Sequence, residues 1–170
     1  MTVDALDILT DSFDRGLETL PALLDGLGPE DLLWRPGPDA NPIAWLSWHI
    51  DRCMDAQMAP LMDLPQIWDQ GWRERFGLPY PPLAMGYGQT SEEVAQFDLV
   101  DAQLLLGYHH EVAALVRTVL AAERNKDLGR IVDTRWDPPV TAAVRLVSVI
   151  NDVNQHTGQI AYLKGLLASR

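Results

Sequence analysis

The sequence is poor in cysteine and in basic residues, and it has no long hydrophobic run. Cys53 is its single cysteine among 170 residues, which excludes an intramolecular disulfide framework. No segment approaches the roughly 18 uninterrupted apolar residues of a membrane-spanning helix. The N-terminal segment MTVDALDILTDSF carries three aspartates and no basic residue, unlike a secretory signal. These absences predict a cytoplasmic protein that does not enter membranes.

The charge balance is strongly acidic. The chain has 13 lysines and arginines against 24 aspartates and glutamates, a net charge of -11, and the basic residues are scattered singly. Such a surface repels phosphate backbones and lacks the basic stripe of a nucleic-acid-binding protein. Hydrophobic residues make up 47% of the sequence, enough for a sizeable core in one domain spanning residues 1–170. We therefore expect small-molecule partners and no nucleic acid.

Apolar residues recur at three- and four-residue steps over four long segments, the spacing of amphipathic helices. We predict helices over residues 3–26, 42–59, 101–123 and 142–168. Asn41 is the expected N-cap of the second helix and Thr141 that of the last. Because no alternating run is long enough for a sheet, we predict an all-α fold, a four-helix bundle with one long crossover loop.

The crossover loop, residues 60–90, is rich in aromatic residues, proline and glycine. We expect one short helix near residues 66–73, and a capping box at Thr90 that starts the next helical stretch. Long loops in compact domains are usually functional or lie at interfaces. The aromatic rings either roof a pocket or pack the loop and a dimer interface; they are Trp68, Trp72, Phe76, Tyr80 and Tyr87.

Three polar side chains form a candidate metal site. Asp152 and His156 lie four residues apart, so both project from one face of the last helix. His49 is expected to point inward from the second helix. Two imidazoles and a carboxylate suit an open divalent-metal site. The alternative is that these residues satisfy one another by hydrogen bonds.

Other residues near these positions are assigned simpler roles. Cys53 is interpreted as a small buried hydrophobic residue, although it could also serve as a soft ligand. Only one of His109 and His110 can face the core, and both are interpreted as structural or solvated. Asp51 and Asp55 face away from the candidate site by helical rotation. Asp55 is still a candidate to hydrogen-bond a metal ligand without binding the metal itself.

Two segments together resemble the DinB-like (YfiT-type) superfamily, in an actinobacterial branch related to metal-dependent thiol S-transferases. They are residues 41–50 (NPIAWLSWHI) and residues 137–163 (DPPVTAAVRLVSVINDVNQHTGQIAYL). The resemblance spans nearly the whole chain, and the motif of the last helix is its most specific part. It implies a four-helix bundle, often a homodimer, that binds zinc, nickel or a similar divalent ion.

The resemblance also implies how the metal is held. The family uses three histidines, one on the second helix and two in an H-x-x-x-H pair on the last. His49 matches the first and His156 the last, whereas Asp152 stands in place of the middle histidine. Gln159 and Asn154 are candidates to hydrogen-bond the ligands.

Several members of the superfamily use a low-molecular-weight thiol such as bacillithiol or mycothiol. The resemblance therefore implies a metal-dependent S-transferase that acts on small electrophiles with a mycothiol-like thiol. A metal-bound thiol loses its proton near neutral pH and becomes a nucleophile. Two alternatives remain: a non-catalytic, stress-associated dimeric bundle, and a metal-dependent hydrolase that uses the same site.

Overall fold

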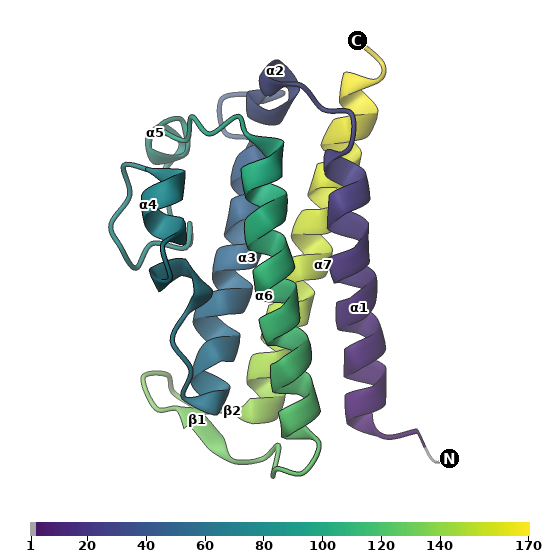
Figure 1. Ribbon diagram of the computed structural model, residues 1–170, viewed down its shortest axis with the longest axis vertical. Helices are drawn as coiled ribbons and strands as arrows, with labels where there is room; N and C mark the ends of the chain where they lie inside the picture. The colour runs from purple at the N-terminus through teal and green to yellow at the C-terminus, as the bar shows by residue number, and fades with distance from the viewer. Residues whose placement is uncertain (1–2) are drawn as a thin grey trace.

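The computed structural model describes residues 3–170 and confirms an all-α bundle. In Figure 1 the long helices lie side by side, with the short helices and a small hairpin at their edges. Over the described residues the long helices are α1 (Ala5–Leu24), α3 (Ile43–Met58), α6 (Ala102–Glu123) and α7 (Ala142–Leu167). None of the described helices is long and apolar enough to cross a membrane.

The ends of the long helices follow local capping. The side chains of Asp4, Asp101 and Thr141 each accept a backbone N–H in the first turn of α1, α6 and α7. The expected cap at Asn41 is wrong, because α3 begins one residue later with Pro42 at the N-cap position. Pro21 lies in the last turn of α1 without ending it, since the helix continues to Leu24.

Helix α3 is the central element, buried on nearly every side. It packs between α6 and α7, and the chain that follows it returns over its remaining face. This position explains why even its polar side chains are inaccessible: Ser47, His49, Asp51, Arg52 and Asp55 are all buried. Each of them consequently needs a partner inside the protein.

Asp51 pairs with His109 of α6 in the core. His109 Nδ1 lies 2.8 Å from Asp51 Oδ1, and its Nε2 lies 2.9 Å from the carbonyl oxygen of Leu17 in α1. Burial lowers the pKa of His109, but the Asp51 carboxylate and the Leu17 carbonyl together raise it more, and the net pKa is above the usual value. His109 is therefore a structural tie between three helices, whereas His110 is exposed.

The crossover segment is anchored to α3 by Asp55. Its carboxylate accepts the backbone N–H groups of Ile67 and Trp68, each at 2.8 Å, and the hydroxyl of Tyr108 at 2.8 Å. The short helix expected near residues 66–73 is divided into two shorter elements. The short helices of the segment are η1 (Ala59–Met62), η2 (Ile67–Asp69), α4 (Trp72–Phe76) and α5 (Ser91–Val94).

Two small elements complete the fold. The short helix α2 (Pro29–Leu33) follows α1, and a two-stranded antiparallel hairpin of β1 (Ile131–Asp133) and β2 (Val140–Thr141) leads into α7. The hairpin leaves the predicted all-α class unchanged, because its strands have only three and two residues and such short strands show no alternating pattern in the sequence. Figure 1 places the hairpin beside the C-terminal end of α3.

Candidate metal centre and its cavity

His49 is held in one orientation by its surroundings. Its ring stacks on Trp45, with 4.8 Å between centroids and 10° between planes. Its Nδ1 hydrogen-bonds the carbonyl oxygen of Met85 in the crossover segment. A carbonyl oxygen only accepts, so Nδ1 carries the proton and Nε2 of the neutral ring keeps its lone pair.

Asp152 and His156 reach toward His49 from α7. His49 Nε2 lies 3.7 Å from Asp152 Oδ1, and His156 Nε2 lies 3.3 Å from the same oxygen. The two imidazole rings meet edge to face, with 4.8 Å between centroids. His156 Nδ1 lies 2.7 Å from Gln159 Oε1, so this ring also directs Nε2 at the carboxylate. The structure thus brings the three predicted residues together.

This arrangement fits a cation. In the neutral rings both Nε2 atoms present lone pairs to a carboxylate oxygen, which is unfavourable unless a positive charge lies between them. Two ligand atoms about 2.1 Å from one tetrahedral ion lie roughly 3.4 Å apart, close to the separations found here. Among the described residues, Oδ2 of Asp152 is buried and has no hydrogen-bond partner. The donor set therefore suits a divalent metal.

A proton can take the place of such a cation. Burial raises the pKa of the Asp152 carboxyl, but interactions with the imidazoles of His156 and His49, when these carry a proton on Nε2, lower it more and leave it well below its usual range. Burial lowers the pKa of His156, and hydrogen bonds to Asp152 and Gln159 then raise it above its usual value. A protonated His156 paired with Asp152 is the arrangement that competes with a metal.

Cys53, interpreted from the sequence as a buried hydrophobic residue with a soft-ligand role as the alternative, lies beside the site. His49, Cys53 and Asp152 offer one ligand atom each within 4.8 Å of one another, a group that could hold a metal ion. The sulfur, however, is equally far, 3.7 Å, from both ring nitrogens of His49. A sulfur sharing a metal with Nε2 would lie nearer to Nε2. Burial, followed by the Asp152 carboxylate, raises the pKa of the Cys53 thiol far above its usual value.

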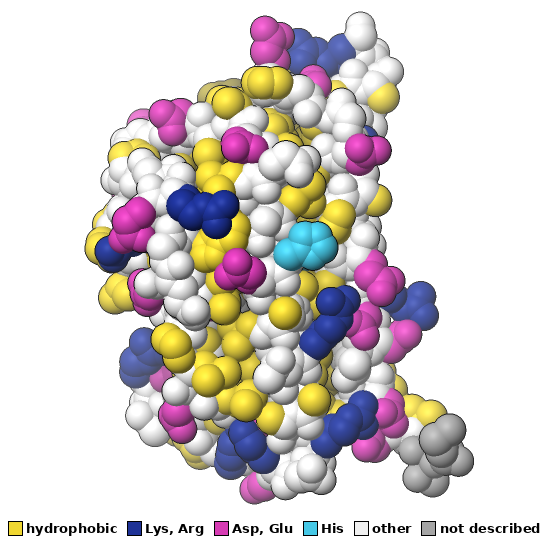
Figure 2. Space-filling model, viewed as in Figure 1, with side chains coloured by type: hydrophobic (Ala, Val, Ile, Leu, Met, Phe, Trp, Pro, Cys, Tyr) yellow, Lys and Arg dark blue, Asp and Glu magenta, His cyan; other side chains and the backbone are white. Residues whose placement is uncertain are grey.

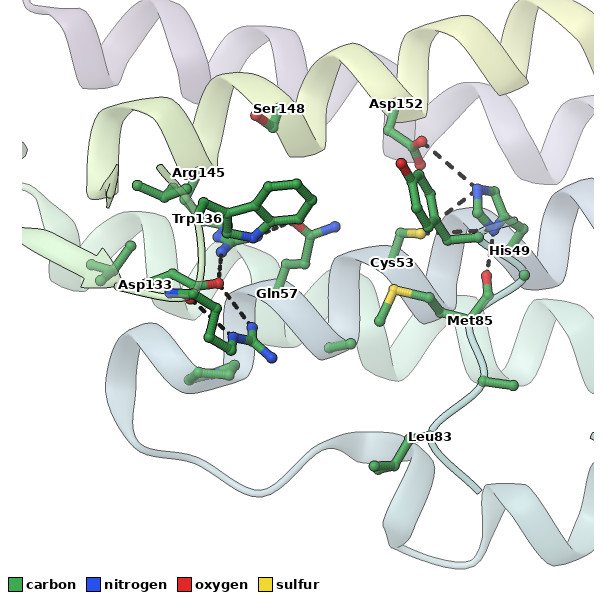
Figure 3. A pocket seen from close by; sticks show the side chains of 18 of the residues that line it. His49, Cys53, Gln57, Leu83, Met85, Asp133, Trp136, Arg145, Ser148 and Asp152 are labelled. Atoms are coloured by element: carbon green, nitrogen blue, oxygen red, sulfur yellow. Dashed lines mark hydrogen bonds and ion pairs between the residues drawn. The ribbon is translucent and has the colours of Figure 1, made fainter. Parts of the chain in front are cut away.

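The site opens into a cavity of about 930 Å³ between α3, α7 and the crossover segment. Figure 3 shows His49 and Asp152 at one end and Asp133 and Arg145 at the other, with Trp136 and Gln57 between them. Of the five aromatic rings in residues 60–90, only Tyr87 lines this cavity. Trp68, Trp72 and Phe76 instead pack around Tyr108 in the core.

Several residues of the site differ from the sequence-based expectation. Asn154 is exposed and faces α1 near Gly16, so it does not support the ligands. Asp55 holds the crossover segment and makes no hydrogen bond to the three residues. The Met85 carbonyl and Trp136 were missed, because a backbone group and a ring brought in by a distant loop leave no spacing signal in the sequence.

Comparison with known proteins supports the fold and the family. The pattern of the DinB superfamily matches residues 12–160. A crystal structure described as the conserved protein of a locus from Enterococcus faecalis superposes with a TM-score of 0.89 at 30% sequence identity. The match covers 99% of this chain and 100% of that chain. None of the curated proteins matches the sequence.

Proposed function

The chain belongs to the DinB superfamily, and from this membership and the site geometry we propose that it is a metal-dependent S-transferase. His49, Asp152 and His156 would hold a divalent ion, zinc or nickel by the chemistry of the donors. A low-molecular-weight thiol would enter the cavity and be transferred to a small electrophile. The observation that carries the proposal is the pair of Nε2 atoms directed at one oxygen of Asp152.

A bound divalent ion would supply one kind of chemistry, a lowered pKa for a thiol or a water molecule at its open position. The protein's own residues would prepare that position. The Met85 carbonyl and the Gln159 side chain hold the protons of the two imidazoles on Nδ1 and keep both Nε2 atoms available. The mainly apolar walls of the cavity limit the access of water to the thiol.

The state of Cys53 supports an external thiol as the nucleophile. Its raised pKa keeps the thiol protonated at neutral pH, and a protonated thiol is a poor nucleophile. The side chain is also buried against His49. In the proposed transfer the sulfur of the external thiol forms a bond to an electrophilic carbon, and the leaving group departs with the electron pair of the bond that breaks. The thiol proton is released to solvent.

The proposal is tested with N-acetylcysteine and chlorodinitrobenzene on the zinc-loaded protein. We expect thiol consumption and chloride release above the uncatalysed rate, and loss of this excess on chelation or in His49→Ala. His110→Ala is the matched control, because His110 is exposed on α6 and makes no contact with the site. A metal-loaded protein that ignores this and other small thiols would contradict the proposal. Cleavage of esters or amides instead would identify a hydrolase.

A further inference from the structure

The cavity extends well beyond the candidate metal centre. It follows α3 and α7, which run antiparallel: His49 faces Asp152 at one end, and Arg145 Nη1 donates to Gln57 Oε1 at 2.6 Å at the other. At about 1.5 Å of helix rise per residue, the two ends lie roughly 10–12 Å apart along the helix axes. A ligand held at the metal end can therefore reach the other end only if it is elongated.

The distal end carries an excess of positive charge. Asp133 Oδ2 accepts from Arg145 Nη2 at 2.7 Å and from Arg135 Nη2 at 2.8 Å, and Oδ1 accepts from Arg135 Nε at 2.9 Å. Two guanidinium groups thus face one carboxylate, which leaves one positive charge uncompensated. This local positive charge stands out because the net charge of the whole chain is -11. Charge this localised, in a cavity wall, favours an anionic ligand.

The arginines also keep hydrogen-bond donors free. A guanidinium group has five N–H donors in a planar fork that matches an oxyanion. Within residues 3–170, Nη1 of Arg135 and Nε of Arg145 donate to no acceptor. Both side chains line the cavity, and that of Arg135 is 85% exposed. An incoming carboxylate could therefore bind without displacing Asp133.

The middle of the cavity is apolar. Trp136 is 58% exposed although it is a large hydrophobic residue, and its indole extends along the cavity between the two ends (Figure 3). Leu83, 74% exposed, lines the cavity from the crossover segment. Exposed apolar side chains that rim a concave site are typical of ligand contact.

From these contacts we propose that the thiol used by this protein carries a carboxylate at the end opposite its sulfur. Arg135 and Arg145 bind the carboxylate, and the apolar chain between the two groups lies along Trp136. The inference rests on the proposed function only for the binding of the thiol sulfur at the metal end of the cavity. The carboxylate end depends on the arginines and Asp133, which lie on the hairpin and the first turn of α7.

The test compares two probes of equal length, mercaptohexanoate and mercaptohexanol, by calorimetry on the zinc-loaded protein. We expect mercaptohexanoate to bind about tenfold more tightly, the effect of one charge-assisted hydrogen-bonded contact. The preference should fall as salt is added, because the contact is ionic. Equal affinities for the two probes would overturn the inference and show that the arginines only neutralise Asp133.

Variants separate this result from the proposed function. In Arg135→Gln the preference for mercaptohexanoate should be lost while zinc content stays unchanged, and Arg145 still pairs with Asp133 to preserve the fold. Arg73→Gln is the matched control, since Arg73 is exposed and lies outside the cavity. If neither thiol binds the zinc-loaded protein more tightly than the zinc-free protein, the proposed function fails. Hexanoate and hexanol, which lack the thiol, then test the carboxylate end alone on the same protein. Equal affinities for hexanoate and hexanol would overturn the inference.

Discussion

At the scale of single residues, the candidate site depends on how closely the crossover segment passes over His49. The Met85 carbonyl fixes the imidazole, and the next residue, Gly86, has a φ of +94°. A Cβ atom on Gly86 would lie 2.6 Å from Trp45 Cζ2 and 2.7 Å from His49 Nδ1. Only glycine allows both this backbone conformation and this approach.

Substitution of Gly86 tests that dependence. Gly86→Ala should lower the free energy of unfolding by about 3 kcal/mol, through left-handed strain and overpacking. It should also weaken zinc binding by about tenfold, because the Met85 carbonyl moves away from His49. Gly88→Ala is the control: its φ is +73°, but nothing lies within 4 Å of its Cβ. Equal zinc affinities in the two variants would contradict this account.

The sequence could predict part of the site at this scale. Four-residue spacing places Asp152 and His156 on one face of a helix, and the structure brings both to His49. Whether they bind a metal stays a prediction. The contacts that orient the rings could be predicted only where they are local, as for Gln159. Trp136, Arg145 and the Met85 carbonyl depend on tertiary packing that no spacing encodes.

At the scale of elements, the crossover segment is kept in place by buried polar groups of α3. Arg52 donates from Nε to the carbonyl of Ala84 at 3.3 Å, and from Nη1 to Gln66 Oε1 at 3.1 Å. Asp55 accepts two backbone N–H groups of η2. Since Ala84 precedes Met85, these bonds also position the carbonyl that orients His49.

Asp55→Asn should loosen this attachment. The amide offers one acceptor where the carboxylate offers two, so a backbone N–H of Ile67 or Trp68 loses its partner at a cost of about 2 kcal/mol. Amide hydrogen exchange at Ile67 and Trp68 should become faster, while exchange in the middle of α6 should follow global stability alone. Asp69→Asn, at an exposed position of the same segment, is the control. Unchanged exchange in Asp55→Asn would refute the anchoring role.

The long helices could be predicted from sequence because their signals are local. Apolar periodicity predicted the bounds of α6 and α7 to within a residue, and the predicted N-cap at Thr141 is confirmed. The path of residues 59–101 could not be predicted, since it depends on Asp55 and Arg52 reaching groups far along the chain.

At the scale of the whole molecule, a buried carboxylate joins the end of α6 to the loop before the hairpin. Glu123 is fully buried and accepts from Arg130 Nη1 at 2.7 Å, Arg130 Nη2 at 2.8 Å and Lys126 Nζ at 3.0 Å. Burial raises the pKa of Glu123, but these cations lower it more, and the net pKa is below its usual value. A lowered folded-state pKa stabilises the fold above the unfolded pKa of about 4.3.

The stability that Glu123 contributes should therefore be lost in acid. At neutral pH, Glu123→Gln should lower the free energy of unfolding by about 2 kcal/mol. The difference from the unmodified protein should shrink as the pH falls below about 4 and through the lowered folded pKa. Glu30→Gln, at an exposed position, should show no such trend. Urea unfolding across this pH range measures the difference, and a constant difference would contradict the assignment.

The central claim is that His49, Asp152 and His156 bind one divalent ion. Elemental analysis of protein purified without chelator tests this claim most directly. We expect about one ion per chain, bound through nitrogen and oxygen. His49→Ala, Asp152→Ala and His156→Ala should each abolish this content, whereas Cys53→Ala and His110→Ala should retain it. Metal content that survives the first three substitutions, or that disappears with Cys53 instead of His156, would contradict the account.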